Sequence, residues 1–228
     1  GGQALWDQLY AEFGLKSFMA GNSGTQMGGW FLNEINGVED FKGLKMRIPG
    51  LAAEVLNRMG GTAVALPGGE IMPSLQSGAI DATEWVGPWN DLAFGFYKIT
   101  KYYYGPGFHE PSSVLECGMN LDAFNQLDND LKKIVEIACE AENSRMLSEF
   151  TAANIDAQQK LINKHGVIIN NFPKDVFRLM MQISSDVVAE TASLGKINKD
   201  IYESWSSFKK NARLRSPYAE HGYVNLST

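Results

Sequence analysis

A carboxylate and an indole end one apolar segment of the chain. The stretch "GAIDATEWVGPWN" covers residues 78–90. Its apolar segment, residues 80–85, finishes on Glu84 and Trp85, and Gly87 and Pro88 then break the chain. In α/β proteins, the ends of buried strands are where ligands bind. A carboxylate beside an indole forms a pocket wall that is both polar and apolar. Glu84 is therefore a candidate ligand-site residue, and the alternative is a solvated surface carboxylate.

An arginine lies inside another apolar strand segment. Arg47, in "KGLKMRIPG", is flanked by Met46 and Ile48. A buried guanidinium is costly unless it is paired, so a carboxylate has to face it. That carboxylate belongs either to the protein or to a ligand. The planar guanidinium suits the second role because it can hold a carboxylate through two parallel hydrogen bonds.

Two glycine-rich stretches carry further oxygen ligands. Gln26 stands in "AGNSGTQMGGW", where small residues allow a close approach and its amide oxygen could ligate a hard cation. The alternative is an ordinary loop glutamine. Glu110 lies in the turn-rich "GPGFHEPSS", next to His109. A lone histidine in such a place is typically a structural hydrogen-bond donor.

The residue types exclude several chemistries. The sequence has no Ser–His or Cys–His pair in a supporting context, no zinc-ligand spacing and no phosphate-binding glycine fingerprint. Oxygen ligands without histidine or cysteine favour a hard cation. Such a cation beside an arginine would trap a small carboxylate, for a binding protein or for a metal-assisted enzyme. Cys117 and Cys139 are interpreted as buried free thiols, with a disulfide as the alternative.

The composition narrows the class of protein. The 228 residues carry a net charge of −6, and no basic block is available to bind nucleic acid. No apolar run reaches the roughly 18 residues of a membrane span. The chain begins without a signal peptide, almost inside an amphipathic helix, so the N-terminus does not identify a compartment and we expect a truncated chain.

The first 120 residues alternate short strands with short helices, which predicts an α/β domain with a largely parallel sheet. The expected strands cover residues 16–20, 45–48, 62–66, 80–85, 98–104 and 113–119, and the expected helices cover 51–59 and 69–76.

The second half of the chain reads as long helices. Residues 128–165 contain neither proline nor glycine, which predicts one helix from an N-cap at Asp128 to Gly166. Its apolar positions drift in phase, so we expect it to run across two domains. A strand at 166–172 and helices from Pro173 and over 198–214 follow, and the polar tail after Pro217 is expected to be loose.

Three long blocks of the chain form a recognisable set: "FKGLKMRIPG", "MGGTAVALPGGEIMPSLQSGAIDATEWVGPWND" and "KYYYGPGFHEPSSVLE". They resemble the periplasmic solute-binding proteins of TRAP transporters, the DctP family, and most closely its 2-oxoacid-binding subgroup. The resemblance implies an α/β periplasmic-binding-protein architecture of two lobes with a long bridging helix, and not an enzyme. It divides the chain into a second-lobe domain (1–108), a return segment of the first lobe with the start of the bridging helix (109–150), the completion of the second lobe (151–196) and a C-terminal helix with its tail (197–228). Members of the family are longer, so we expect the first lobe to be only partly present.

The resemblance also assigns roles. It implies that the chain captures a monocarboxylate 2-oxoacid such as pyruvate in the periplasm and delivers it to TRAP membrane subunits. Arg47 matches the arginine that clamps the substrate carboxylate, and Trp85 and Gln26 would also line the substrate. Gln26, Glu84, the Trp85 carbonyl and Glu110 match ligands of a cation, Na⁺ or alternatively Ca²⁺. Separately, the C-terminal helix carries Trp205 and Phe208, which need cover, and this predicts a possible homodimer.

Overall fold

A computed structural model describes residues 1–227 and divides them into two compact units. Unit 1 gathers Gly1–Ser17, Gly118–Leu127 and the chain from Val188 onward, and unit 2 consists of Phe18–Cys117 and Asp128–Val187. Each unit is assembled from segments that are far apart in the sequence.

Unit 2 contains a six-stranded sheet in the order β4-β3-β5-β2-β6-β8. The strands are β2 (Gly29–Phe31), β3 (Lys45–Arg47), β4 (Thr62–Val64), β5 (Ala82–Thr83), β6 (Tyr102–Gly105) and β8 (Ile168–Asn171). The expected parallel pairing holds for β3 with β4, β3 with β5 and β6 with β8. It is wrong for β2, which is antiparallel to both of its neighbours.

Alternation along the central strands places consecutive aromatic residues on opposite faces of the sheet. Phe31 and Tyr104 belong to one buried cluster, and Trp30 and Tyr103 to the other. This is the period of two that a strand buried on both faces requires. Trp30 and Tyr103 stack with their ring centroids 4.0 Å apart.

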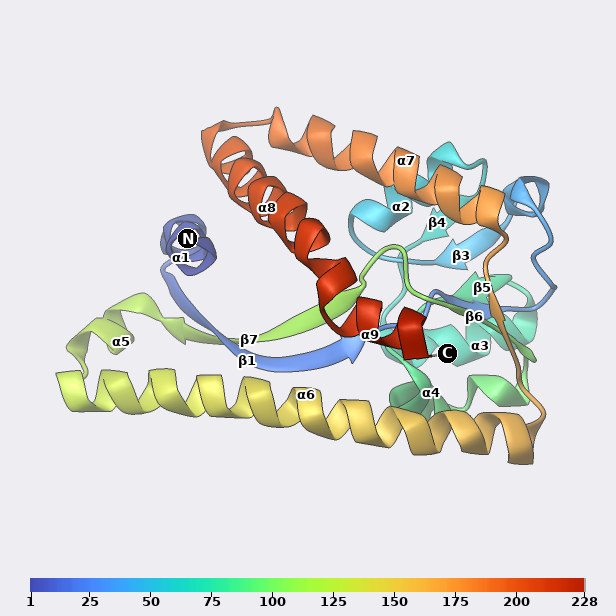
Figure 1. The fold of residues 1–228 in the computed structure, drawn as a ribbon, viewed down its shortest axis with the longest axis horizontal. Coiled ribbons are helices and arrows are strands. Elements are labelled where there is room, and N and C mark those ends of the chain that lie inside the picture. Colours follow the sequence, from blue (N-terminus) through green and yellow to red (C-terminus); the bar gives the residue numbers. More distant parts are fainter. Residues whose placement is uncertain (228) are drawn as a thin grey trace. The chain divides into compact units, whose positions relative to one another are not determined.

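Helices cover both faces of this sheet (Figure 1). On the face of Phe31 lie α2 (Leu51–Arg58) and α7 (Lys174–Ala192), which contribute residues such as Leu56 and Met180. On the face of Trp30 lie α3 (Gly68–Ser77), α4 (Pro88–Phe94), a short 3₁₀ helix (Phe96–Lys98) and the end of α6. The sheet is thus the buried middle layer that fixes where its strand ends point.

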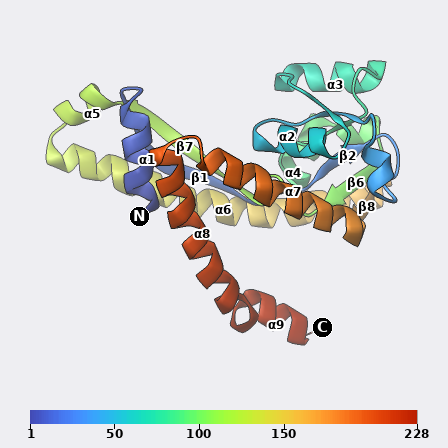
Figure 2. The same ribbon diagram turned by 90° about the horizontal axis from the view of Figure 1, so that it is seen from above.

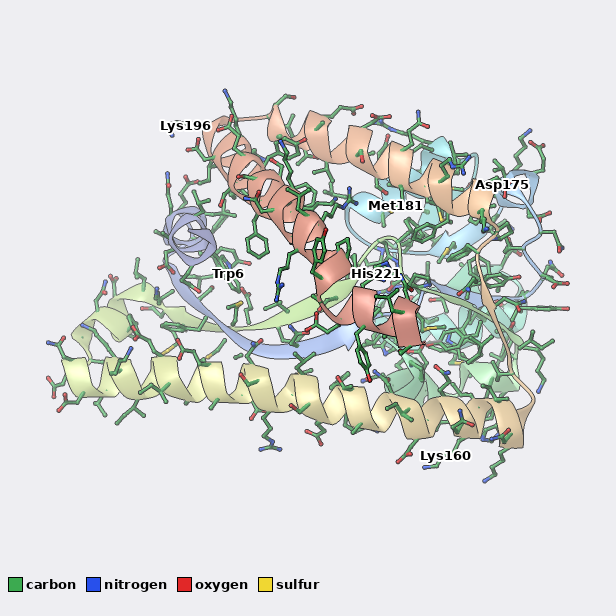
Figure 3. All side chains as sticks on the ribbon, in the orientation of Figure 1. Trp6, Lys160, Asp175, Met181, Lys196 and His221 are labelled. Carbon is green, nitrogen blue, oxygen red and sulfur yellow. The ribbon has the colours of Figure 1, made fainter. Side chains whose placement is uncertain are left out.

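The long helix α6 extends over Asn129–His165, which confirms the predicted single helix. Gly166 ends it with a φ of 64°, a left-handed conformation that glycine adopts without strain. Its buried residues, Cys139, Phe150, Ala157 and Leu161, are spaced by roughly whole turns and form one stripe. The rest is solvated, and Lys160 lies on the side of the helix away from the sheet (Figure 3). All of α6 belongs to unit 2.

Two further strands, β1 (Leu15–Thr25) and β7 (Ser112–Asn120), pair as a separate two-stranded sheet. The first 3₁₀ helix, at Val38–Phe41, lies between β2 and β3. Among the described residues, no helix combines the length and the apolar character needed to cross a bilayer.

Unit 1 is helical. α1 (Gly2–Ala11) packs against α8 (Lys196–Arg215), as Figure 2 shows, and α5 (Leu121–Gln126) completes the unit with the C-terminal segment. The expectation of a loose tail is wrong, because a 3₁₀ turn at Ser216–Tyr218 leads into α9 (Glu220–Ser227). The turn is tight: a Cβ on Gly222 would lie 1.9 Å from the Pro217 carbonyl oxygen, so glycine is required there.

Candidate functional site

The register of β3 against β5 brings Arg47 and Glu84 together. Arg47, the last residue of β3, is paired in parallel with Thr83, the last residue of β5, and Glu84 follows directly. The Glu84 amide donates to the Arg47 carbonyl at 3.3 Å. Parallel strands end at the same edge of a sheet, so both side chains emerge there. Arg47 Nη1 donates to Glu84 Oε1 in a buried ion pair.

The guanidinium of Arg47 is held from three directions. Besides the Glu84 contact, its Nε donates to the Leu66 carbonyl oxygen at 3.2 Å, and its Cζ lies 5.4 Å from the centroid of the Trp85 ring. The Trp85 indole in turn packs on Phe94, with centroids 4.9 Å apart. Within the described part of the chain, Nη2 of Arg47 has no hydrogen-bond partner. The orientation of the guanidinium is therefore fixed while one of its donor groups stays available.

Glu84 is enclosed by a second partner. His109 Nε2 lies 3.2 Å from Glu84 Oε2, and both side chains are almost completely buried, with exposures of 1% and 3%. The other ring nitrogen, Nδ1, is buried with no partner in the described structure. His109 thus has the structural hydrogen-bonding role expected from the sequence. That its partner is Glu84 could not be predicted, because 25 residues separate the two.

Gln26 is brought to the same region by backbone hydrogen bonds. Both of its backbone polar groups bond to the loop of residues 107–111. The Gln26 N–H donates to Pro111 O at 3.3 Å, and the Gln26 carbonyl accepts from Gly107 N at 2.8 Å. The next amide, that of Met27, donates to Val86 O at 3.1 Å. The Gln26 segment therefore runs beside the segment that carries Glu84 and Trp85.

The side chain of Gln26 has an unused ligand atom. The residue is 2% exposed, its Nε2 donates to Ser23 Oγ at 3.2 Å, and its Oε1 is buried without a partner in the described structure. A buried polar atom without a partner costs free energy, so such an atom is a sign of a missing ligand. Glu110 differs from the other predicted ligands because it is exposed to solvent.

The donor set fits a hard cation better than a transition metal. The described residues contain no group of three or more His, Cys, Asp or Glu side chains placed to hold a metal. A cation would therefore depend on the oxygens of Gln26, Glu84 and the main chain, which are ligands that Na⁺ and Ca²⁺ accept.

A buried aspartate that sequence reasoning missed supports this edge of the sheet. Asp91 Oδ1 accepts from the amides of Val86 and Gly87, at 3.2 and 3.1 Å, and Oδ2 accepts from Trp30 Nε1 at 2.8 Å and from Tyr103 Oη at 2.7 Å. Burial raises the pKa of Asp91 to about 6, although the four hydrogen bonds oppose that rise. Asp91 therefore fixes the turn directly after Trp85. The signal in the sequence was an acidic residue in the first turn of a helix that follows Gly87-Pro88.

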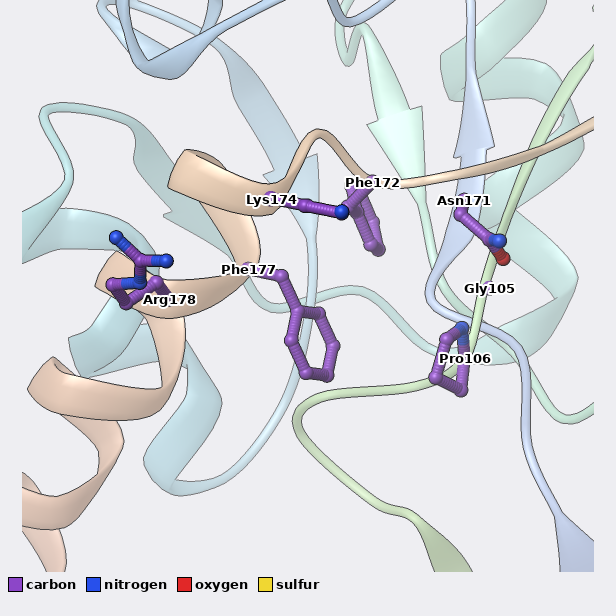
Figure 4. Close-up of a pocket in the computed structure, with 7 residues that line it drawn as sticks. All are labelled: Gly105, Pro106, Asn171, Phe172, Lys174, Phe177 and Arg178. Atoms are coloured by element: carbon purple, nitrogen blue, oxygen red, sulfur yellow. The ribbon is translucent and has the colours of Figure 1, made fainter. Parts of the chain in front are cut away.

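A cavity elsewhere in unit 2 is not part of this site. It measures about 390 Å³ and is lined by Gly105, Pro106, Asn171, Phe172, Lys174, Phe177 and Arg178. Phe172, Phe177 and Pro106 surround it, with Arg178 at one end (Figure 4). Both of its basic residues are exposed, and none of the predicted site residues lines it.

Comparison with known families gives a match over residues 2–194, to the bacterial extracellular solute-binding proteins of family 7, DctP. A monocarboxylate 2-oxoacid-binding periplasmic protein of Nostoc sp. is 40% identical over all 228 residues, and the chain spans 62% of that protein's length.

Two crystal structures of TRAP periplasmic solute-binding proteins are also similar. The protein of Pseudoalteromonas atlantica, with bound sodium and pyruvate, is 38% identical with a TM-score of 0.93, and the match covers 99% of this chain and 68% of that one. The protein of Colwellia psychrerythraea, with bound calcium and pyruvate, is 39% identical with a TM-score of 0.93, over 99% and 69% of the two chains. These likenesses confirm the α/β architecture predicted from the sequence, and they are likenesses to binding proteins rather than to enzymes.

Proposed function

The chain belongs to the DctP family of bacterial extracellular solute-binding proteins, and from this premise we propose that it captures a small monocarboxylate 2-oxoacid, such as pyruvate, together with a cation. The observation that carries the proposal is the buried Arg47–Glu84–His109 cluster at the edge of the sheet. The neighbouring segment carries Gln26, whose Oε1 has no hydrogen-bond partner among the residues that the structure describes.

Arg47 is the proposed clamp for the carboxylate of the acid. Its Nε and Nη1 are occupied by Leu66 and Glu84, so Nη2 is the donor group left for a ligand oxygen. A carboxylate that also reached Nη1 would share that group with Glu84 and complete a two-point contact. The half-buried Trp85 indole would cover the apolar part of the acid, and Gln26 would contribute a polar contact.

Gln26, Glu84, the Trp85 carbonyl and Glu110 are the proposed ligands of the cation. Na⁺ is our first choice and Ca²⁺ the alternative, since the relatives from Pseudoalteromonas and Colwellia hold these two ions respectively. The bound cation would add positive charge beside Glu84. His109 would hold Glu84 in place from the other side. Glu110 is the ligand that the structure supports least, because its side chain faces solvent.

The charge balance of the cluster supports a single site for both ligands. Arg47 and Glu84 neutralise each other. A carboxylate ligand alone would leave an excess negative charge in a buried environment, which is costly. A cation at Glu84 removes that excess, so each ligand favours binding of the other.

The family context supports the remaining parts of the proposal. We propose that the protein works in the periplasm and delivers its acid to the membrane subunits of a TRAP transporter. Trp205 and Phe208 on α8 are 44% and 75% exposed, and we propose this helix as the contact of a homodimer.

Isothermal titration calorimetry tests the function directly. The purified protein is titrated with 2-oxo monocarboxylates, the matching 2-hydroxy acids and a dicarboxylate, each with Na⁺ or with Ca²⁺. We expect saturable one-to-one binding of the short 2-oxoacids and no loss of acid over hours of incubation. Absence of binding to every acid would overturn the proposal, and steady consumption of an acid would favour the enzyme that the sequence left as an alternative.

A further inference from the structure

The two cysteines of the chain lie on neighbouring elements. Cys117 is on β7 and Cys139 on α6, and burial, together with the nearby Cys117 thiol, raises the pKa of the Cys139 thiol. Cys139 is buried at 7% exposure, and Cys117 is partly exposed. Both residues belong to unit 2.

The packing around Gly21 shows independently that β7 and α6 meet. A Cβ on Gly21 would lie 2.6 Å from Met146 Sδ and 3.1 Å from Leu115 Cβ, so β1, β7 and α6 converge at this glycine. Leu115 is two residues before Cys117 and therefore on the same face of β7. Met146 is two helical turns after Cys139 and therefore on the same face of α6. Cys117 and Cys139 therefore both lie on the interface between the strand and the helix.

We propose that Cys117 and Cys139 form a reversible disulfide bond that links β7 to α6. The alternative is a pair of reduced thiols that pack as small apolar side chains. The position of both cysteines on the packed faces of β7 and α6, with Cys117 partly accessible from solvent, favours the bond wherever a disulfide oxidant is present, as in the oxidising compartments outside the bacterial cytoplasm.

The oxidant is a disulfide, either of a small molecule or of a thiol–disulfide exchange protein. The Cys117 thiolate attacks one of its sulfurs, forms a mixed disulfide and releases the first thiol. Cys139 then loses its proton and attacks Cys117 Sγ, which releases the second thiol and closes the intramolecular bond. The protein loses two protons and two electrons, and the oxidant is reduced to two thiols. Cys117 acts first because it is the accessible partner, and because burial raises the pKa of the Cys139 thiol.

The position of the bond gives it a structural consequence. The chain leaves unit 2 after Cys117, forms the Gly118–Leu127 segment of unit 1, and returns to unit 2 at Asp128, where α6 begins. A bond from Cys117 to Cys139 closes this segment into a loop of about 20 residues, which lowers the entropy of the unfolded chain.

Mass spectrometry and thiol counting test the proposal. The whole protein is equilibrated with oxidised glutathione, free thiols are alkylated under denaturing conditions, and the sample is digested without reduction. We expect loss of both thiols together, a decrease in mass equal to two hydrogen atoms, and a cross-linked peptide pair that dithiothreitol separates. The melting temperature of the oxidised form should exceed that of the reduced form by about 5–10 °C.

Cys117→Ser and Cys139→Ser are the controls. The Cys139→Ser variant should stop at a glutathione adduct on Cys117, and the Cys117→Ser variant should react slowly or not at all. Two alkylated cysteines in the wild-type protein after equilibration would overturn the proposal, and so would a stable glutathione adduct on Cys117 that Cys139 does not resolve. These wild-type readouts decide the question even if a serine variant does not fold.

Discussion

Replacing Arg47 with lysine tests the carboxylate clamp. The substitution keeps the positive charge beside Glu84, whose side chain is 3% exposed. An alanine there would leave that carboxylate buried and unpaired, at a cost of about 3–5 kcal/mol in folding free energy, and would confuse binding with unfolding. One ammonium cannot contact Leu66 and Glu84 and also present a planar fork to a ligand.

The expected loss follows from the contacts. A hydrogen bond to a charged group contributes about 1.5–3 kcal/mol, so losing one arm of the fork should weaken binding of the acid about 10- to 100-fold. Arg58→Lys is the matched control, since Arg58 pairs with Glu54 at 2.7 Å on the solvated side of α2. It should change affinity by less than about twofold, because exposed pairs contribute about 1 kcal/mol or less to stability and this one is not in the site. Calorimetric titration of both variants gives the comparison. Wild-type affinity in Arg47→Lys would refute the clamp.

Three further perturbations follow from the geometry around the site. Asp91 has a pKa of about 6, above its unfolded value of 3.8, so its contribution to stability is greatest below pH 3.8 and is lost as the pH rises through 6. The difference in free energy of unfolding between wild type and Asp91→Asn should therefore change by about 2 kcal/mol between pH 4 and 7 in denaturant titrations, and a pH-independent difference would contradict this. Gly29→Ala should lower the free energy of unfolding by about 2–4 kcal/mol, because φ is 131° and the new Cβ would lie 2.7 Å from a carbonyl oxygen of β5, whereas the control Gly69→Ala has open space and should be neutral or slightly stabilising. His109→Leu should weaken cation binding about 10- to 100-fold by removing the donor to Glu84, and His109→Gln should restore most of it; equal losses in both variants would point to packing rather than the hydrogen bond.

The elements with strong local signals were predictable from the sequence. The absence of glycine and proline between Asp128 and Gly166 defined α6 to within a residue at each end. In contrast, β2 was missed because its three residues have no periodic pattern, and its place in the sheet comes from pairing with β5 and β6. The C-terminal helix α9 was missed because its polar residues pack little, and its start depends on the turn at Pro217.

The site was predictable as a list of residues and not as a geometry. A guanidinium between Met46 and Ile48 had to find a carboxylate, but the sequence could not choose between a ligand and Glu84, which is 37 residues away. The structure places Glu84 against it without excluding a shared ligand. Asp91 was missed because its partners, Trp30 and Tyr103, come from two other strands. Non-local contacts of this kind depend on the register of the sheet.

The coupling between cation and acid tests the central proposal most directly. Pyruvate is titrated by calorimetry into protein freed of bound ions by chelation and ion exchange, and into the same protein in saturating Na⁺ or Ca²⁺ at constant ionic strength, with residual sodium and calcium measured by elemental analysis. The Arg47–Glu84 pair is already neutral, so we predict that the cation raises pyruvate affinity by about 5- to 150-fold, corresponding to a coupling of about 1–3 kcal/mol. Equal affinities in the ion-free and ion-saturated protein would contradict a shared site.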